Sequence, residues 1–67
     1  MFDKGYDDGV DAYNSDVRRG RVAQEPGEIG KRGLDSVNNL PNSKTLSEED
    51  ASAYFVGFYM GYTSQRS

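Results

Sequence analysis

All eight aromatic side chains of this chain lie near its two ends. They are Phe2, Tyr6, Tyr13, Tyr54, Phe55, Phe58, Tyr59 and Tyr62. Because aromatic side chains supply the largest buried areas of a small core, the two ends must pack against each other. A length of 67 residues allows one small domain at most. The sequence therefore predicts a single domain, residues 1–67, whose core joins segments that are far apart in the chain.

The first end has the periodicity of an amphipathic helix over about residues 3–19. Its apolar residues recur every three or four positions and share one helical stripe, formed by Phe2, Tyr6, Val10, Tyr13 and Val17. The aspartates lie opposite this stripe, so we expect them to face solvent. Asp3 is expected to cap the helix at its N-terminus, and Gly20 is expected to end it.

The second end predicts another helix, over about residues 47–63. Ser47 is a favourable N-cap, and Asp50 follows three residues later in a box-like position. Residues 20–46 form a polar connection that contains both prolines. This connection is either largely irregular or holds a short third helix formed around Ile29, Leu34 and Val37. The expected fold class is all-α, a two-helix antiparallel hairpin with this partly irregular connection.

Both predicted helices carry the pattern glycine–aromatic–x–x–glycine–apolar. Each glycine costs about 1 kcal/mol of helix propensity relative to alanine, so four of them require a compensating gain. Close approach of the two helices, with rings of one lying over glycines of the other, would provide it. The alternative is a glycine strip that receives a partner or ligand. The residues expected to pack the helices together are Gly5, Tyr6, Gly9, Val10, Tyr13, Gly57, Phe58, Gly61 and Tyr62.

The second helix has more apolar surface than one packing partner covers. Its aromatics fill one face, whereas Ala53, Val56 and Met60 fall on the other side of the helical wheel. A helix that is apolar all round needs burial on more than one face. Either the middle segment folds over these three residues, or they bind a second chain. In the second case they form a partner-binding patch, used by another protein or by a homodimer.

The composition excludes the usual catalytic and metal-binding sites. The chain has no histidine and no cysteine, so it lacks the common general base and thiolate metal ligands. We therefore expect no enzymatic activity, no cofactor and no bound metal. Residues 51–62, the longest apolar run, are fewer than the roughly 20 that span a bilayer, and residues 1–10 do not resemble a signal peptide. A cytoplasmic protein that does not bind membranes is expected.

The net charge of −3 hides an alternation along the chain. Residues 1–16 sum to −4, residues 17–32 to +3 and residues 33–67 to −2. This alternation suits a protein partner better than a phosphate backbone, which favours uniform basicity. The basic segment supplies a second set of candidate partner-binding residues, Arg18, Arg19, Arg21, Lys31 and Arg32. We expect these basic residues either to contact nucleic-acid phosphate or an acidic protein surface, or to form a solvated patch.

The order of these motifs resembles that of the ribosome modulation factor family and its many small relatives. The similarity consists of an early glycine–aromatic motif, a proline in the connection and a late glycine–aromatic motif, here Gly5, Tyr6, Gly9, Pro41, Gly57 and Phe58. The resemblance implies two helices joined by a loop, and a ribosome-binding role that silences translation in stationary cells. The ribosome binder of that family is compact and basic, whereas this chain is acidic and has a longer middle.

These features predict a small non-enzymatic binding protein that docks on a macromolecular partner and inhibits or modulates it. Small acidic inhibitors encoded by phages and mobile elements are similar in size and composition. Another protein is the expected partner. The alternative is a ribosome- or nucleic-acid-associated modulation factor that uses the basic middle segment.

Overall fold

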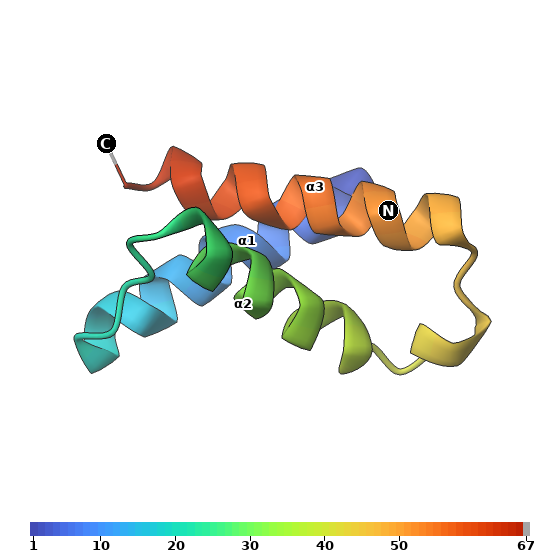
Figure 1. Cartoon of the computed structure of the whole chain (residues 1–67), viewed down its shortest axis with the longest axis horizontal. Helices are drawn as coiled ribbons and strands as arrows, with labels where there is room; N and C mark the ends of the chain where they lie inside the picture. Colours follow the sequence, from blue (N-terminus) through green and yellow to red (C-terminus); the bar gives the residue numbers. More distant parts are fainter. Residues whose placement is uncertain (67) are drawn as a thin grey trace.

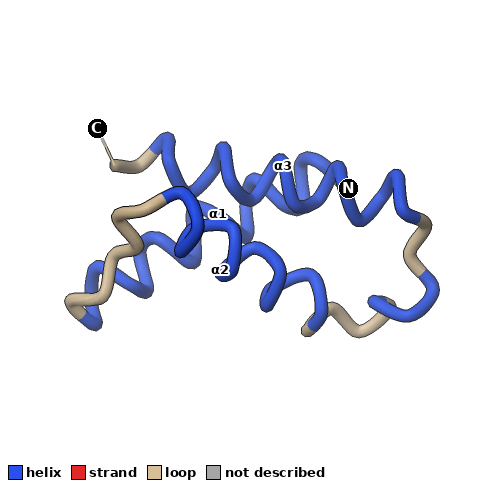
Figure 2. The backbone as a smooth tube through the Cα atoms, in the orientation of Figure 1, coloured by secondary structure: helices blue, strands red, loops and turns tan. Residues whose placement is uncertain are grey.

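The structure is a computed structural model that describes residues 1–66. Its elements are α1 (Phe2–Arg19), α2 (Pro26–Asn38), the short 3-10 helix η1 (Ser43–Thr45) and α3 (Glu48–Ser64), as Figures 1 and 2 show. The all-helical class predicted from the sequence is confirmed. The two-helix arrangement is not, because the connection contains the complete 13-residue helix α2. No helix within the described residues is long and apolar enough to cross a membrane.

α1 and α3 run in the same direction, so the predicted antiparallel hairpin is wrong. Gly5 lies against the backbone of Tyr54, and Gly9, one turn later in α1, lies against the backbone of Phe58, one turn later in α3. In an antiparallel pair these contacts would progress in opposite directions. Figure 1 shows the cause, since α2 carries the chain back along the molecule and α3 therefore starts at the same end as α1.

Glycine ends α1 where the sequence predicts it. Gly20 adopts the left-handed conformation, with φ of 67°. Its N–H donates to the carbonyl oxygen of Val17 at 3.0 Å, and the N–H of Arg21 donates to that of Asp16 at 2.8 Å. These two bonds form a Schellman motif, which satisfies carbonyl groups at the helix end. The motif also turns the chain toward α2.

The N-termini of α1 and α3 differ in their capping. The Oγ of Ser47 accepts the N–H of Asp50 at 3.1 Å, so the cap predicted for α3 is present. α1 has no side-chain cap, because it already begins at Phe2. Asp3 therefore lies inside the first turn rather than at the cap position. Its negative charge still interacts favourably there with the positive end of the helix dipole.

The centre of the core is a ladder of three rings on α3. Tyr54, Phe58 and Tyr62 recur every fourth residue and are at most 1% exposed. Consecutive ring centroids lie 6.5 and 6.2 Å apart. Ala23 and Ile29, from the loop before α2 and from α2 itself, complete the buried cluster. The core is therefore built on α3, with α1 and α2 packed around it.

α1 contributes less apolar surface to this core than its sequence predicts. Its buried residues are Gly5, Gly9 and Asp16. The two ends of its apolar stripe remain open to solvent, since Phe2 is 38% and Val17 is 48% exposed. Close backbone packing and one buried carboxylate therefore replace much of the expected apolar contact of this helix.

Candidate functional site

α1 and α3 cross with their backbones in contact at four glycines. A Cβ atom placed on any of the four would lie closer than 3.0 Å to backbone of the other helix, a distance that real Cβ atoms essentially never show. The facing pairs are Gly5 with Tyr54, Gly9 with Phe58, Gly57 with Phe2 and Gly61 with Tyr6. Backbone atoms, rather than the rings expected from the sequence, thus lie nearest to these glycines. The other helix occupies both glycine strips, so neither is open to a ligand.

The four contacts are related by an approximate two-fold axis. Gly5 of α1 corresponds to Gly57 of α3, and Gly9 corresponds to Gly61. Each of the four glycines faces the residue that lies three positions before the corresponding glycine on the other helix. Paired glycines four residues apart are known to let parallel helices cross at short distance. The repeated glycine motif therefore serves the packing of α1 on α3.

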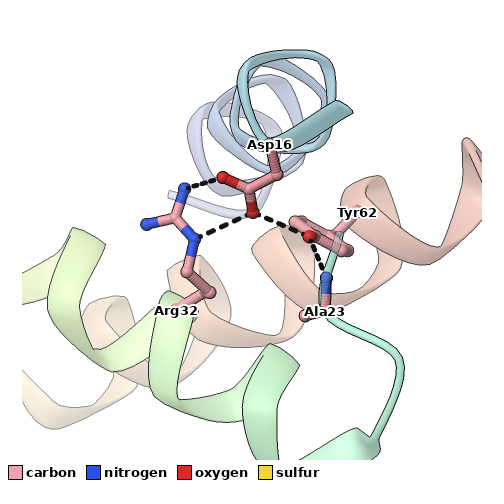
Figure 3. Close-up of polar contacts among 4 residues, drawn as sticks. All are labelled: Asp16, Ala23, Arg32 and Tyr62. Carbon is pink, nitrogen blue, oxygen red and sulfur yellow. Dashed lines mark hydrogen bonds and ion pairs between the residues drawn. The ribbon is translucent and has the colours of Figure 1, made fainter. Parts of the chain in front are cut away.

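One buried carboxylate joins all three helices, as Figure 3 shows. The hydroxyl of Tyr62 donates to Asp16 Oδ2 at 2.7 Å and accepts the N–H of Ala23 at 2.8 Å. Arg32 donates from Nε and Nη2 to the two oxygens of Asp16, at 3.1 and 3.2 Å. Asp16 is only 5% exposed, and these donors satisfy its two oxygen atoms, which would be costly to bury without hydrogen bonds. The guanidinium group of Arg32 is thereby occupied by an ion pair within the protein.

A second aspartate of α1 meets a second tyrosine of α3. The hydroxyl of Tyr54 donates to Asp8 Oδ2, and Ser36 Oγ of α2 lies 2.7 Å from the same hydroxyl. Because that hydroxyl has a single proton, Ser36 is the donor to it. The expectation that the aspartates face solvent is therefore wrong for Asp16, and Asp8 is only partly exposed. Both aspartate–tyrosine pairs span 46 residues of sequence, which is the parallel register of α1 and α3.

Burial changes the titration of both tyrosines. It raises the pKa of Tyr54 from 10.0 to about 12, and the hydrogen bond to Asp8 raises it as well. Burial also raises the pKa of Tyr62, and the hydrogen bond to Asp16 acts in the same direction. The folded protein thus holds these phenol protons more tightly than the unfolded chain. Stability from this source is complete below the unfolded pKa and is lost as pH rises through the folded pKa.

We expect the free energy of unfolding to fall by about 2 kcal/mol between pH 9 and 12 because of Tyr54, since one pKa unit corresponds to about 1.4 kcal/mol and the folded tyrosine begins to ionise near pH 12. Urea unfolding followed by circular dichroism at several pH values measures this loss. In the Tyr54→Phe variant the decline should be smaller by that amount. Parallel pH curves for the two proteins would contradict the prediction.

α2 and α3 leave an apolar groove of about 370 Å³ open to solvent. It is lined by Leu34, Val37, Ala51, Ser52, Phe55 and Val56. Leu34 is 54% and Val56 48% exposed, and Met60, one turn further along α3, is 49% exposed. We refer to these six lining residues together with Met60 as the α2–α3 surface. It contains three of the six large hydrophobic side chains that the described residues expose, namely Leu34, Val56 and Met60.

The structure settles how the middle segment meets α3. Gly30 and Gly33 of α2 lie against the rings of Phe55 and Phe58, so α2 covers that side of α3. Of the patch predicted from the helical wheel, Val56 and Met60 stay about half exposed and Ala53 is half-buried. Sequence reasoning did not place Leu34 and Val37 beside this patch, because their proximity depends on the direction of α2.

Four of the five predicted basic residues are exposed, and the fifth is not free. The exposed ones are Arg18, Arg19, Arg21 and Lys31. Arg32 pairs with Asp16 instead. A second hollow, of about 360 Å³, is lined by Arg21, Ala23, Glu28, Lys31, Arg32 and Asp35. Its two acidic residues offset the basic ones, so it is not a uniformly positive site.

Comparisons of the chain with models of known protein families, with curated proteins and with solved structures find no match. The resemblance to the ribosome modulation factor family therefore stays a prediction from the motifs alone. Within residues 1–66, no group of three or more histidine, cysteine, aspartate or glutamate side chains is placed to hold a metal ion.

Proposed function

We propose that the chain is a non-enzymatic binding protein that docks on a protein partner through the α2–α3 surface and thereby inhibits or modulates it. The half-exposed side chains of Leu34, Val56 and Met60 around an apolar groove support this proposal. Complete burial of an aliphatic side chain of this size contributes about 1.5–3 kcal/mol. Covering all three would therefore give a partner a substantial gain in binding free energy.

The shape and charge of this surface favour a partner helix. The groove lies between two helices, and an amphipathic helix can place its apolar face into such a groove. α3 carries Glu48, Glu49 and Asp50 in its first turn and no basic residue over its whole length. These acids directly precede the groove residues Ala51 and Ser52. We expect the partner helix to carry basic residues beside its apolar stripe, because they would lie near these acids.

The double variant Val56→Glu/Met60→Glu should lose partner binding by about 30-fold or more, the effect typical of residues at the centre of an interface. Both side chains are about half exposed, so circular dichroism should show unchanged helix content. The experiment captures a partner with the tagged protein and then measures the Kd of the purified pair. Asn14→Glu/Gln24→Glu adds the same charge at exposed positions outside the α2–α3 surface and should bind like the wild type.

Two results would contradict this proposal. Loss of helix content in Val56→Glu/Met60→Glu would mean that these side chains are core. An unchanged Kd would mean that the surface is not the contact. If binding instead falls steeply with salt and with Arg18→Glu/Arg19→Glu, the second candidate function applies, a ribosome- or nucleic-acid-associated modulation factor. The exposure of Arg18, Arg19, Arg21 and Lys31 supports that candidate.

A further inference from the structure

We propose that the free protein covers its α2–α3 surface with a second copy of itself, in an antiparallel two-fold dimer that must separate before a partner docks. The inference rests on the proposed function, because both assign the same surface as an interface. It adds a regulation of that surface, in which self-association competes with partner binding. Three features of the structure support it, namely the apolar stripe of α3, the charges at the two ends of the molecule and the area required.

The apolar stripe of α3 is complementary to itself. Val56 and Met60 lie one turn apart on the helix and are 48% and 49% exposed. If two copies of α3 pack antiparallel about a point midway between these residues, Val56 of each copy meets Met60 of the other. Methionine is flexible and fills irregular gaps, so Met60 suits the groove beside Val56 and Leu34. A two-fold interface requires this kind of self-complementary patch.

The parallel direction of α1 and α3 separates the charges of the molecule. Both helices begin at one end, where two basic residues, Lys4 and Lys44, are outnumbered by six acidic ones, Asp3, Asp7, Asp8, Glu48, Glu49 and Asp50. Both helices end at the opposite end, which carries Arg18, Arg19, Arg21 and Arg66 against Glu25 and Glu28. The molecule is 33 Å long and about 19 Å across, so its two ends are several Debye lengths apart.

This separation of charge determines how two copies can pair. An antiparallel arrangement places the acidic end of each copy beside the basic end of the other. A parallel arrangement would bring like charges together, which costs binding free energy. The charges therefore favour the same antiparallel orientation as the stripe of Val56 and Met60. In that orientation Arg66 of one copy also lies near the first turn of α3 of the other.

The molecule has enough surface for such an interface. A stable interface buries about 800 Å² on each partner, and this chain exposes 4483 Å². Under a fifth of the surface would therefore be covered. The arrangement has the usual anatomy, with Leu34, Val56 and Met60 at the centre and charged residues around them.

Because the chain has no cysteine, single-cysteine variants test the arrangement directly. We expect Val56→Cys mixed with Met60→Cys to form disulfide-linked dimers at least about 10-fold faster than the Gln24→Cys control, and faster than either variant alone. Light scattering of the wild type should show a mass that rises with concentration from 7.4 kDa toward twice that value. Arg18→Glu/Arg19→Glu should weaken the dimer, since it removes the basic end.

The outcomes separate this inference from the proposed function. A wild-type mass that stays at 7.4 kDa up to millimolar concentration overturns the dimer. A dimer without preferred cross-linking between positions 56 and 60 overturns the antiparallel arrangement. If the protein is a monomer but Val56→Glu/Met60→Glu loses the partner, only the dimer is wrong. If the cross-linked dimer forms but partner binding ignores those substitutions, the proposed function is wrong and with it the competition between dimer and partner, whereas the dimer itself stands.

Discussion

The Gly9→Ala variant should be strongly destabilised, although alanine is the best helix-forming residue. A Cβ atom at this position would lie against the carbonyl of Phe58 and the amide nitrogen of Tyr62. These are backbone atoms, so no side-chain rotation can relieve the contact, and α1 must move away from α3. We expect a loss of about 3 kcal/mol or more, at or above the upper range for overpacking. A domain of this length has only about 3–10 kcal/mol of stability in total.

Gly27→Ala is the matched control, because the same substitution there has the opposite result. Gly27 also lies in a helix, but a Cβ atom at this position would have no neighbour within 4 Å. Alanine should therefore stabilise the protein by up to about 1 kcal/mol through helix propensity. Urea unfolding followed by circular dichroism measures both changes.

The approximate two-fold axis extends this prediction to the counterpart of Gly9. Gly61 faces the backbone of Tyr6 in the way that Gly9 faces the backbone of Phe58. Gly61→Ala should therefore destabilise the protein about as much as Gly9→Ala. If Gly9→Ala unfolds at the urea concentration of the wild type, the close crossing of α1 and α3 is wrong.

Local signals in the sequence predicted the elements better than their arrangement. The helices at the two ends of the chain, the end of α1 at Gly20 and the cap of α3 at Ser47 depend on a few neighbouring residues, and all are present. The direction of α3 does not depend on such signals, because an apolar stripe looks the same in a parallel and an antiparallel pair. The length of α2 decides the direction of α3, because this helix carries the chain back along the molecule before α3 begins. The sequence left a short third helix around Ile29, Leu34 and Val37 open as an alternative, but only as part of an antiparallel hairpin.

The sequence predicted only the part of the candidate site that depends on a single helix. Val56 and Met60 follow from a helical wheel of α3 alone, whereas the groove also needs Leu34 and Val37 from another helix. The buried carboxylate was missed because a wheel assigns every aspartate of α1 to the polar face. Equal spacing was the available signal, since the aspartates at 8 and 16 match the tyrosines at 54 and 62.

Asp16→Ala should destabilise the protein by about 3 kcal/mol, because it leaves one buried and one partly buried donor without an acceptor. Tyr62 loses the carboxylate to which its hydroxyl donates at 2.7 Å. Arg32 loses both of its hydrogen bonds to the same group. Removing one partner of a buried ion pair typically costs about 3–5 kcal/mol. The lower end applies here, since the Arg32 side chain is 38% exposed and water replaces part of the lost interaction.

Asp11→Ala is the control, since Asp11 is an exposed aspartate of the same helix. It should change the free energy of unfolding by less than about 0.5 kcal/mol. A double-mutant cycle with Arg32→Ala then separates the two donors. If the ion pair dominates, Asp16→Ala costs much less in the Arg32→Ala background than in the wild type. If the cost is the same in both backgrounds, the bond from Tyr62 carries the effect, and equal stability of Asp16→Ala and Asp11→Ala would contradict a structural role for the carboxylate.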